Sequence, residues 1–205
     1  SIASIAKLSI CSRPKSQVHA VQLLVKDGQI SQCPSARKPG TTVEVIDLFF
    51  NAPVRKKFLK AERTEFLALE AVVKRFALSN PGITLSLKHN DKPIFELPAA
   101  TCERTIKARI KKLMGKAFLD NAVYFEVAQG DLNIQGWASN ANYQRSQNDK
   151  QWHYLNQRMV KDKLISHAVK QAYESILHPG RFPACLLYLT LPEQEVDVNV
   201  HPTKH

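Results

Sequence analysis

Apolar residues recur in this chain with two different periods, and the alternation between those periods limits which folds it can adopt. Apolar and polar residues alternate, as in a half-buried β-strand, around Leu8–Ile10, Val43–Val45 and Ile83–Leu87. Between residues 60 and 79 the apolar positions instead follow the spacing of one helical face. No internal repeat is present, so strand and helix patterns in succession predict an α+β protein.

The remaining pattern predicts several further elements and one domain boundary. A hairpin is expected over 83–97, and a boundary follows it near 98–101, where a basic helix begins that ends at Gly115. The later elements are a hairpin over 122–137, an exposed loop over 139–150, two strands about an Asn156-Gln157 turn, an amphipathic helix over 165–176 and a buried strand over 184–191.

The charge balance favours a polyanionic partner. The 205 residues include 29 Lys and Arg against 18 Asp and Glu, which gives a formal net charge of +11. Nucleic acid is one such partner, and a merely solvated basic surface is the alternative that charge alone leaves open.

Several function classes find no support. The four cysteines are scattered without C-x-x-C spacing, and the His201/His205 pair lacks the glutamate of a zinc helix, so no metal site is predicted. No apolar run is long enough to span a membrane, and no secretory signal opens the chain, so the expected compartment is the cytoplasm. No phosphate-binding loop, nucleophile elbow or pair of catalytic carboxylates is recognisable.

Two long strings carry more information than the composition. They are GTTVEVIDLFFNAPVRKKFLK, residues 40–60, and VDVNVHPTKH, residues 196–205, and between them lies YLNQRMVKDKLISHAVKQAY, residues 154–173. Together they closely resemble the MutL/PMS family of DNA mismatch repair ATPases, in the GHKL superfamily that includes gyrase B and the histidine kinases, and the overall resemblance favours a bacterial member. One departure is Gln157, where the family usually has glycine, so the turn there is expected to be of another type.

The resemblance implies a fragment of the family's N-terminal region. Residues 1–100 resemble the C-terminal part of a GHKL-type ATPase α/β sandwich, and residues 101–205 resemble a ribosomal-S5-like transducer domain truncated at its C-terminus. The family's earlier motifs, which supply the catalytic glutamate, the magnesium-binding asparagine, the adenine pocket and the lid, are absent. The full-length parent is therefore expected to use ATP and Mg²⁺, whereas this fragment is expected to hold neither and not to hydrolyse ATP.

The resemblance also assigns nucleotide contacts. Gly40, Thr41 and Thr42 match the family's last nucleotide motif, where a glycine lets the backbone approach the ligand and two hydroxyls offer donors; an ordinary strand entry is the alternative. Lys204 matches the catalytic lysine that reaches the γ-phosphate from the transducer domain, a role suited to a compact charge on a flexible stem. A frayed surface lysine is the alternative for Lys204.

DNA-binding residues are expected on the second half of the chain. Arg158, Lys161 and Lys163 lie around the turn and helix start where this family exposes a basic groove, and several cations spaced to meet phosphates suffice for non-specific binding. The basic helix, with Arg104, Lys107, Arg109 and Lys111, extends that surface unless its cations are simply solvated. The basic cluster at Arg55–Lys57 either engages acidic groups or caps the helix that follows it.

Two functions are carried forward. The first is an ATP-dependent matchmaker in DNA mismatch repair, which binds double- and single-stranded DNA, acts as a homodimer in the full-length protein and couples a MutS-type mismatch sensor to a downstream nuclease or helicase. The second is a non-catalytic nucleic-acid-binding module on an S5-like scaffold without ATP coupling. A related topoisomerase transducer fits the strings at Asp47–Leu59 and 196–204 less well.

Overall fold

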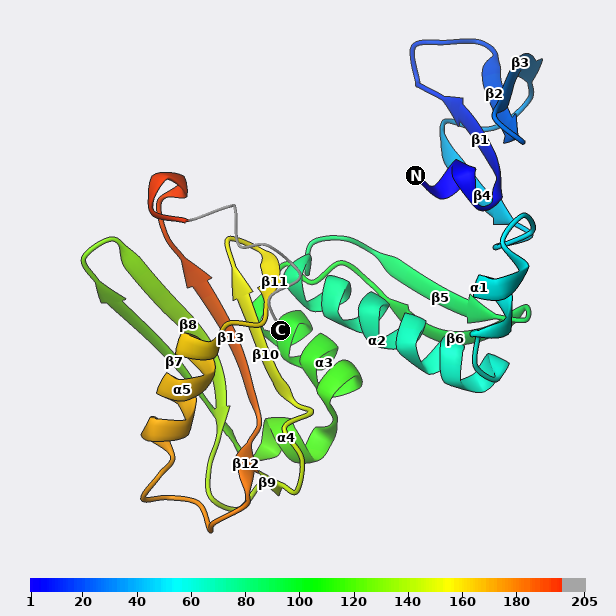
Figure 1. Ribbon diagram of the computed structural model, residues 1–205. Coiled ribbons are helices and arrows are strands. Elements are labelled where there is room, and N and C mark those ends of the chain that lie inside the picture. Colours follow the sequence, from blue (N-terminus) through cyan, green and yellow to red (C-terminus); the bar gives the residue numbers. More distant parts are fainter. Residues whose placement is uncertain (197–205) are drawn as a thin grey trace. The chain divides into compact units, whose positions relative to one another are not determined.

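A computed structural model describes residues 1–196, which form two compact units (Figure 1). The N-terminal unit comprises residues 1–65 and the C-terminal unit begins at residue 66. Both contain β-sheet, and the described residues mix helices with mainly antiparallel strands, so the predicted α+β class is confirmed. The boundary near residue 100 that the sequence indicates stays a prediction about the family's domains.

The N-terminal unit contains one four-stranded antiparallel sheet with the strand order β3-β2-β1-β4. Its strands are β1 (Lys7–Arg13), β2 (Ala20–Lys26), β3 (Gln29–Ser35) and β4 (Gly40–Ile46), preceded by the short 3₁₀ helix η1 (Ile2–Ser4) and followed by α1 (Pro53–Lys57). The register places Ile10 opposite both Leu23 and Val43, so directly paired apolar side chains share one face of the sheet. This pairing explains the period-two pattern of the sequence.

The C-terminal unit is built on a five-stranded sheet with the order β11-β10-β13-β8-β7, in which the pair β10 and β13 is parallel and the others are antiparallel. The strands of the whole C-terminal unit are β5 (Leu85–His89), β6 (Lys92–Leu97), β7 (Ala122–Gln129), β8 (Leu132–Ser139), β9 (Gln144–Arg145), β10 (Gln151–Leu155), β11 (Arg158–Val160), β12 (Phe182–Pro183) and β13 (Cys185–Thr190). The helices of this unit are α3 (Glu103–Met114), α4 (Lys116–Asp120), α5 (Lys163–Ala172) and the 3₁₀ helix η2 (Glu193–Glu195). Helix α2 (Glu62–Ser79) has its first four residues in the N-terminal unit and the rest in the C-terminal unit.

The expected hairpins are present. Strands β5 and β6 pair antiparallel, as do β7 and β8, and β10 turns into β11 at Asn156-Gln157. The expected helix over 165–176 ends earlier, because α5 stops at Ala172 and Tyr173–Leu177 continue as hydrogen-bonded turns. The local pattern therefore predicts the type of these elements better than their ends.

The main core lies between one face of the five-stranded sheet and helices α2, α3 and α4. Its members include Leu78 of α2, Leu97 of β6, Ile110 of α3 and Phe118 of α4, each at most 2% exposed. Two tyrosines of the sheet donate into the end of α2: Tyr154 Oη to the Arg75 carbonyl and Tyr188 Oη to the Leu78 carbonyl, both at 2.8 Å. One core thus includes residues from both sides of position 100.

A smaller cluster lies on the opposite face of the same sheet, under α5. Alternate residues of β13 point to opposite faces, so Leu186 belongs to the main core while Cys185 and Leu187 join Val169 of α5. The five-stranded sheet is therefore covered on both faces, as the position of α5 in Figure 1 shows.

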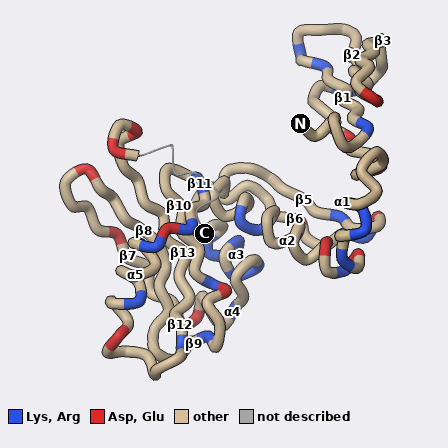
Figure 2. Tube along the Cα trace, in the orientation of Figure 1, with Lys and Arg blue, Asp and Glu red and all other residues tan. Residues whose placement is uncertain are grey.

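Charge is unevenly distributed over this unit. Lys and Arg lie along α3, whereas the β7–β8 hairpin carries Asp and Glu but no basic residue (Figure 2). No Lys or Arg occurs anywhere between Lys116 and Arg145. The net positive charge of the chain therefore does not extend to this hairpin.

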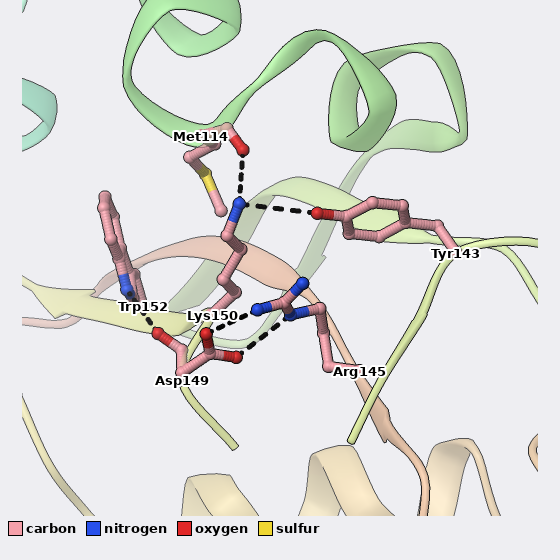
Figure 3. A network of polar contacts seen from close by, with 6 residues as sticks. All are labelled: Met114, Tyr143, Arg145, Asp149, Lys150 and Trp152. Atoms are coloured by element: carbon pink, nitrogen blue, oxygen red, sulfur yellow. Dashed lines mark hydrogen bonds and ion pairs between the residues drawn. The ribbon is translucent and has the colours of Figure 1, made fainter. Parts of the chain in front are cut away.

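The expected exposed loop over 139–150 is partly wrong. Ser139 is buried at the end of β8, where its Oγ accepts from Ala184 N, and β9 within the loop pairs with β12. Figure 3 shows the cause: Lys150 Nζ donates to the Met114 carbonyl at the C-terminus of α3 at 2.7 Å, and Arg145 forms a two-bond ion pair with Asp149. These contacts satisfy an unpaired helix-end carbonyl and hold the loop.

Gly136 lies on β8 directly against the backbone of β13. It pairs with Leu187, its φ is 156°, and a Cβ atom built there would stand 2.0 Å from the Leu186 carbonyl oxygen. Only glycine leaves room for that carbonyl.

Candidate nucleotide and nucleic-acid sites

Gly40, Thr41 and Thr42 are the first three residues of β4 in the N-terminal unit. Gly40 has φ 135°, a value that favours glycine, and lies opposite Arg13 of β1. Thr41 Oγ1 is 2.9 Å from Ser12 Oγ, across the strand pair. The motif is thus an exposed strand entry whose Thr41 hydroxyl already has a partner within the chain.

Arg37 holds this strand entry and was not singled out by sequence reasoning. Its Nη1 donates to Thr42 Oγ1 at 2.9 Å and also to the Cys11 carbonyl, and its Nε donates to the Lys38 carbonyl. A Cβ at Gly40 would stand 3.2 Å from Arg37 Nη2. The guanidinium therefore lies directly against the glycine. Lys204, the other predicted nucleotide contact, lies outside the described residues.

The β10–β11 turn carries Arg158. Asn156 and Gln157 both have positive φ, 46° and 67°, and they join residues 155 and 158, which face each other in the register. This is the geometry of a tight two-residue hairpin turn, in which glycine is favoured at the second position. The turn therefore keeps the conformation that glycine would favour, and the expectation that Gln157 brings a turn of another type is wrong.

Asn156 fastens this turn to the end of β13. Its backbone N–H donates to the Leu189 carbonyl at 2.9 Å, its Nδ2 donates to the Leu191 carbonyl at 2.9 Å, and its Oδ1 accepts from Leu191 N at 3.0 Å. Three hydrogen bonds from one residue fix the position from which Arg158 projects.

The three predicted DNA-binding cations are all exposed. Arg158 begins β11, Lys161 follows that strand, and Lys163 begins α5. Asp162 lies between the lysines and caps α5, because its Oδ1 accepts from Leu164 N and Ile165 N at 2.8 and 3.0 Å. Within residues 1–196 none of the three cations forms an ion pair with a carboxylate.

The expectation that Arg109 adds to a basic helix surface is wrong. Arg109 is 5% exposed, and its guanidinium donates to the carbonyls of Ala77, Ile83 and Pro98 at 2.8 to 3.0 Å and to that of Asn80 at 3.4 Å. Burial lowers the pKa of Arg109. The other cations of α3 remain on the exposed side, where Lys107 pairs with Glu103.

The C-terminal unit has a groove of about 1300 Å³ beside the β10–β11 turn. Cys102 and Lys107 of the α3 region line it on one side and Asn156 and Gln157 on another, with Tyr124 of β7 in its wall. The turn that carries Arg158 therefore borders a concave surface that is also reached by a cation of α3.

The buried Cys185 and His153 do not form a nucleophilic site. Cys185 Sγ lies 3.5 Å from His153 Nε2, but burial raises the pKa of Cys185 to about 12 and lowers the pKa of His153. A neutral thiol beside a neutral imidazole is unreactive at ordinary pH. Among the described residues, none of the helices combines the length and the apolar character that crossing a membrane requires.

Comparisons with known proteins agree on one family. A family model described as the C-terminal domain of DNA mismatch repair protein matches residues 110–205. A DNA mismatch repair protein MutL from Cellvibrio japonicus is 45% identical over 209 residues, a match that covers 100% of this chain and 33% of that protein. The chain thus spans about a third of the length of the curated relatives it matches.

Solved structures give the same result. The Aquifex aeolicus MutL ATPase domain complexed with ADP superposes with a TM-score of 0.72 at 26% identity, covering 93% of this chain and 70% of that chain. A crystal structure of the N-terminal domain of a DNA repair protein gives a TM-score of 0.79 at 26% identity, covering 98% and 65%. All of this chain matches about a third of a MutL protein at 45% identity, and its fold matches that of a MutL ATPase domain. We therefore conclude that the chain belongs to the MutL family of DNA mismatch repair proteins.

Proposed function

We propose that this chain is the DNA-binding and nucleotide-responsive part of an ATP-driven matchmaker in DNA mismatch repair. The observation that carries the DNA-binding role is the set of exposed cations Arg158, Lys161 and Lys163, which have no carboxylate partner among the described residues. The turn that precedes Arg158 lines the groove. Cations without competing carboxylates are available to phosphates, and release of the condensed counterions then favours binding.

Phosphate contacts of this kind read no base sequence, so both double- and single-stranded DNA are suitable partners. The hydrogen bonds of Asn156 support the proposal, because a turn that is already fixed loses little entropy when DNA binds.

We further propose that the whole protein binds ATP with Mg²⁺, with Gly40, Thr41 and Thr42 at the nucleotide and Lys204 at its γ-phosphate. The similarity to a MutL ATPase domain complexed with ADP supports nucleotide binding. Lys204 acts as the catalytic contact by favouring the state in which its ammonium meets the terminal phosphate. On this basis residues 1–100 belong to the ATPase domain and residues 101–205 to the transducer domain.

The proposed partners follow from the same role. A protein that couples mismatch detection to repair binds a MutS-type sensor and a downstream nuclease or helicase. The full-length protein works as a homodimer and acts in the cytoplasm, where bacterial DNA lies. The alternative, a nucleic-acid-binding module without ATP coupling, would use the same cations, but Lys204 would have no role at a phosphate.

Changing Arg158, Lys161 and Lys163 together to Glu is expected to abolish binding of duplex DNA at low salt. Wild-type affinity should fall steeply with salt, and each lost phosphate contact should reduce the slope of log affinity against log salt concentration by about 1. Fluorescence anisotropy of a labelled duplex between low and moderate salt measures both quantities.

A matched control reverses three other exposed cations, Lys26, Lys88 and Lys92, and changes the net charge by the same amount. If binding depends on these specific positions, the control keeps most of its affinity. Equal loss in both triple variants would show that only the net charge matters and would refute the assignment.

Lys204→Ala in the complete protein is expected to lower the rate of ATP hydrolysis by roughly 10²-fold, because one preorganised cation at a developing negative charge contributes on that order. Steady-state phosphate release measures the rate, and DNA binding by the same variant checks that it is folded. Wild-type turnover would contradict the phosphate role and favour the module without ATP coupling.

A further inference from the structure

Strand β7 forms an edge of the five-stranded sheet, and its outer side pairs with no other strand in the part of the chain that the structure describes. It is eight residues long, contains no Pro, Gly, Lys or Arg, and pairs with β8 in one continuous register from Ala122 to Gln129. The opposite edge, β11, has only three residues and begins with Arg158. Proteins usually blunt sheet edges by shortness, charge or proline; β7 is long, contains no proline, and has Glu126 as its one charged residue.

The sequence of β7 is almost the same when read from either end. Residues 122–128 are Ala-Val-Tyr-Phe-Glu-Val-Ala, which is a palindrome apart from Tyr124 and Glu126. Two copies that pair antiparallel about Phe125 therefore place Val123 of each copy opposite Val127 of the other. The same register places Tyr124 opposite Glu126, so apolar residues meet apolar residues and a hydroxyl donor meets a carboxylate acceptor.

The exposed groups of β7 suit such a pairing. Val123 is 62% exposed and Val127 is 55% exposed, so the register would bury apolar side chains that now face solvent. Tyr124 Oη already lies 3.3 Å from Glu126 Oε2 within one copy, which shows that the two groups are hydrogen-bond partners of suitable reach. The hairpin also lacks Lys and Arg, so two copies would meet there without the repulsion expected elsewhere on a chain of charge +11.

We propose that β7 is a self-association strand: two copies of this chain join their β7 edges antiparallel about Phe125 and form one continuous sheet. The contact needs neither nucleotide nor DNA, because all of its groups belong to the hairpin. This self-association goes beyond the proposed repair function, and its test is independent of the tests of DNA and ATP binding. The occupant of the edge is a second copy because only an identical strand supplies the palindromic match.

Engineered disulfides test the register directly. In a chain whose Cys11, Cys33 and Cys102 are replaced by Ser, the double variant Val123→Cys/Val127→Cys places each new thiol opposite its counterpart in the second copy. Opposed Cα atoms in antiparallel strands lie about 4.5–5.5 Å apart, within the range that a disulfide bridges. Both sites are exposed, so the substitutions leave the core intact.

The two single variants are the matched controls. Val123 of one copy and Val123 of the other are offset by four residues, roughly 13 Å along the strands, which a disulfide cannot span. Mild oxidation is expected to convert the double variant largely to covalent dimer and to leave both single variants monomeric on a non-reducing gel. Equal crosslinking of the single and double variants, or none in any of them, overturns the proposal.

Analytical ultracentrifugation of the unmodified 205-residue chain supplies an independent measurement. The chain is expected to show a reversible monomer–dimer equilibrium without nucleotide, and Val127→Lys is expected to weaken it by about tenfold or more, because an unpaired ammonium would be placed against Val123 of the second copy. Ile176→Lys, which adds the same charge at another exposed apolar site, should leave it unchanged. A chain that stays monomeric, or a dimer that Val127→Lys does not weaken, contradicts the proposal.

Discussion

A chain carrying Gly136→Ala is expected to have a strongly destabilised C-terminal unit. The added methyl would stand 2.0 Å from the Leu186 carbonyl oxygen and 3.0 Å from Leu187 Cα, both backbone atoms of the neighbouring strand. A flexible side chain could rotate away, but here β8 and β13 must separate, and the positive φ of Gly136 adds strain for any residue with a Cβ. The expected loss is about 3 kcal/mol or more in the free energy of unfolding.

Gly130→Ala is the control within the same hairpin. Gly130 lies in the β7–β8 turn at φ 57°, and a Cβ built there meets nothing within 4 Å, so the cost is only that of the left-handed backbone, about 1 kcal/mol. Both tryptophans of the chain, Trp137 and Trp152, belong to the C-terminal unit, so tryptophan fluorescence during urea unfolding reports on that unit alone. Equal stability of the two variants would show that β8 and β13 can accommodate a methyl group at residue 136.

Arg109→Met is expected to destabilise the C-terminal unit by about 3–5 kcal/mol, since hydrogen bonds from a charged donor contribute about 1.5–3 kcal/mol each and the freed carbonyls stay buried. The guanidinium joins the end of α2, the loop after it and the end of β6 to α3, through the carbonyls of Ala77, Ile83 and Pro98. No carboxylate takes part in these contacts, so the loss concerns satisfied carbonyl groups rather than an ion pair.

Two further variants separate geometry from charge at this position. Arg109→Lys keeps the charge but cannot reach several carbonyls at once, so most of the loss should remain. Lys111→Met removes an exposed cation from the same helix and should change the free energy of unfolding by less than about 0.5 kcal/mol. If Arg109→Lys proved as stable as the wild type, charge alone would explain the role of Arg109.

The hydrophobic period predicted most elements correctly, because a helix or sheet face that packs on a core must show its spacing in the sequence. The basic helix α3 contains an exception. By its charge Arg109 is expected among the surface cations, but it follows Ile106 by three residues and precedes Leu113 by four, which places it on the buried face. Position on the helix predicted its burial better than its charge did.

Contacts between segments far apart in sequence were not predictable from local pattern. Lys150 lies 36 residues from Met114, whose carbonyl it meets, and Arg37 lies 26 residues from Cys11. Neither segment carries a signal that identifies its partner, so the loop over 139–150 was expected to be exposed and Arg37 was overlooked. Family resemblance supplied Gly40–Thr42, Lys204 and Arg158 instead, and their roles stay predictions.

The core that α2 shares with the five-stranded sheet also decides where this polypeptide can be shortened. A piece that started at residue 101 would lack the carbonyls that accept from Tyr154, Tyr188 and Arg109, and three interior donors would be left without acceptors. A cut before α2 preserves all of them. Expression or crystallisation of the C-terminal unit alone therefore requires residues 61–100, even though the family resemblance assigns them to the ATPase domain.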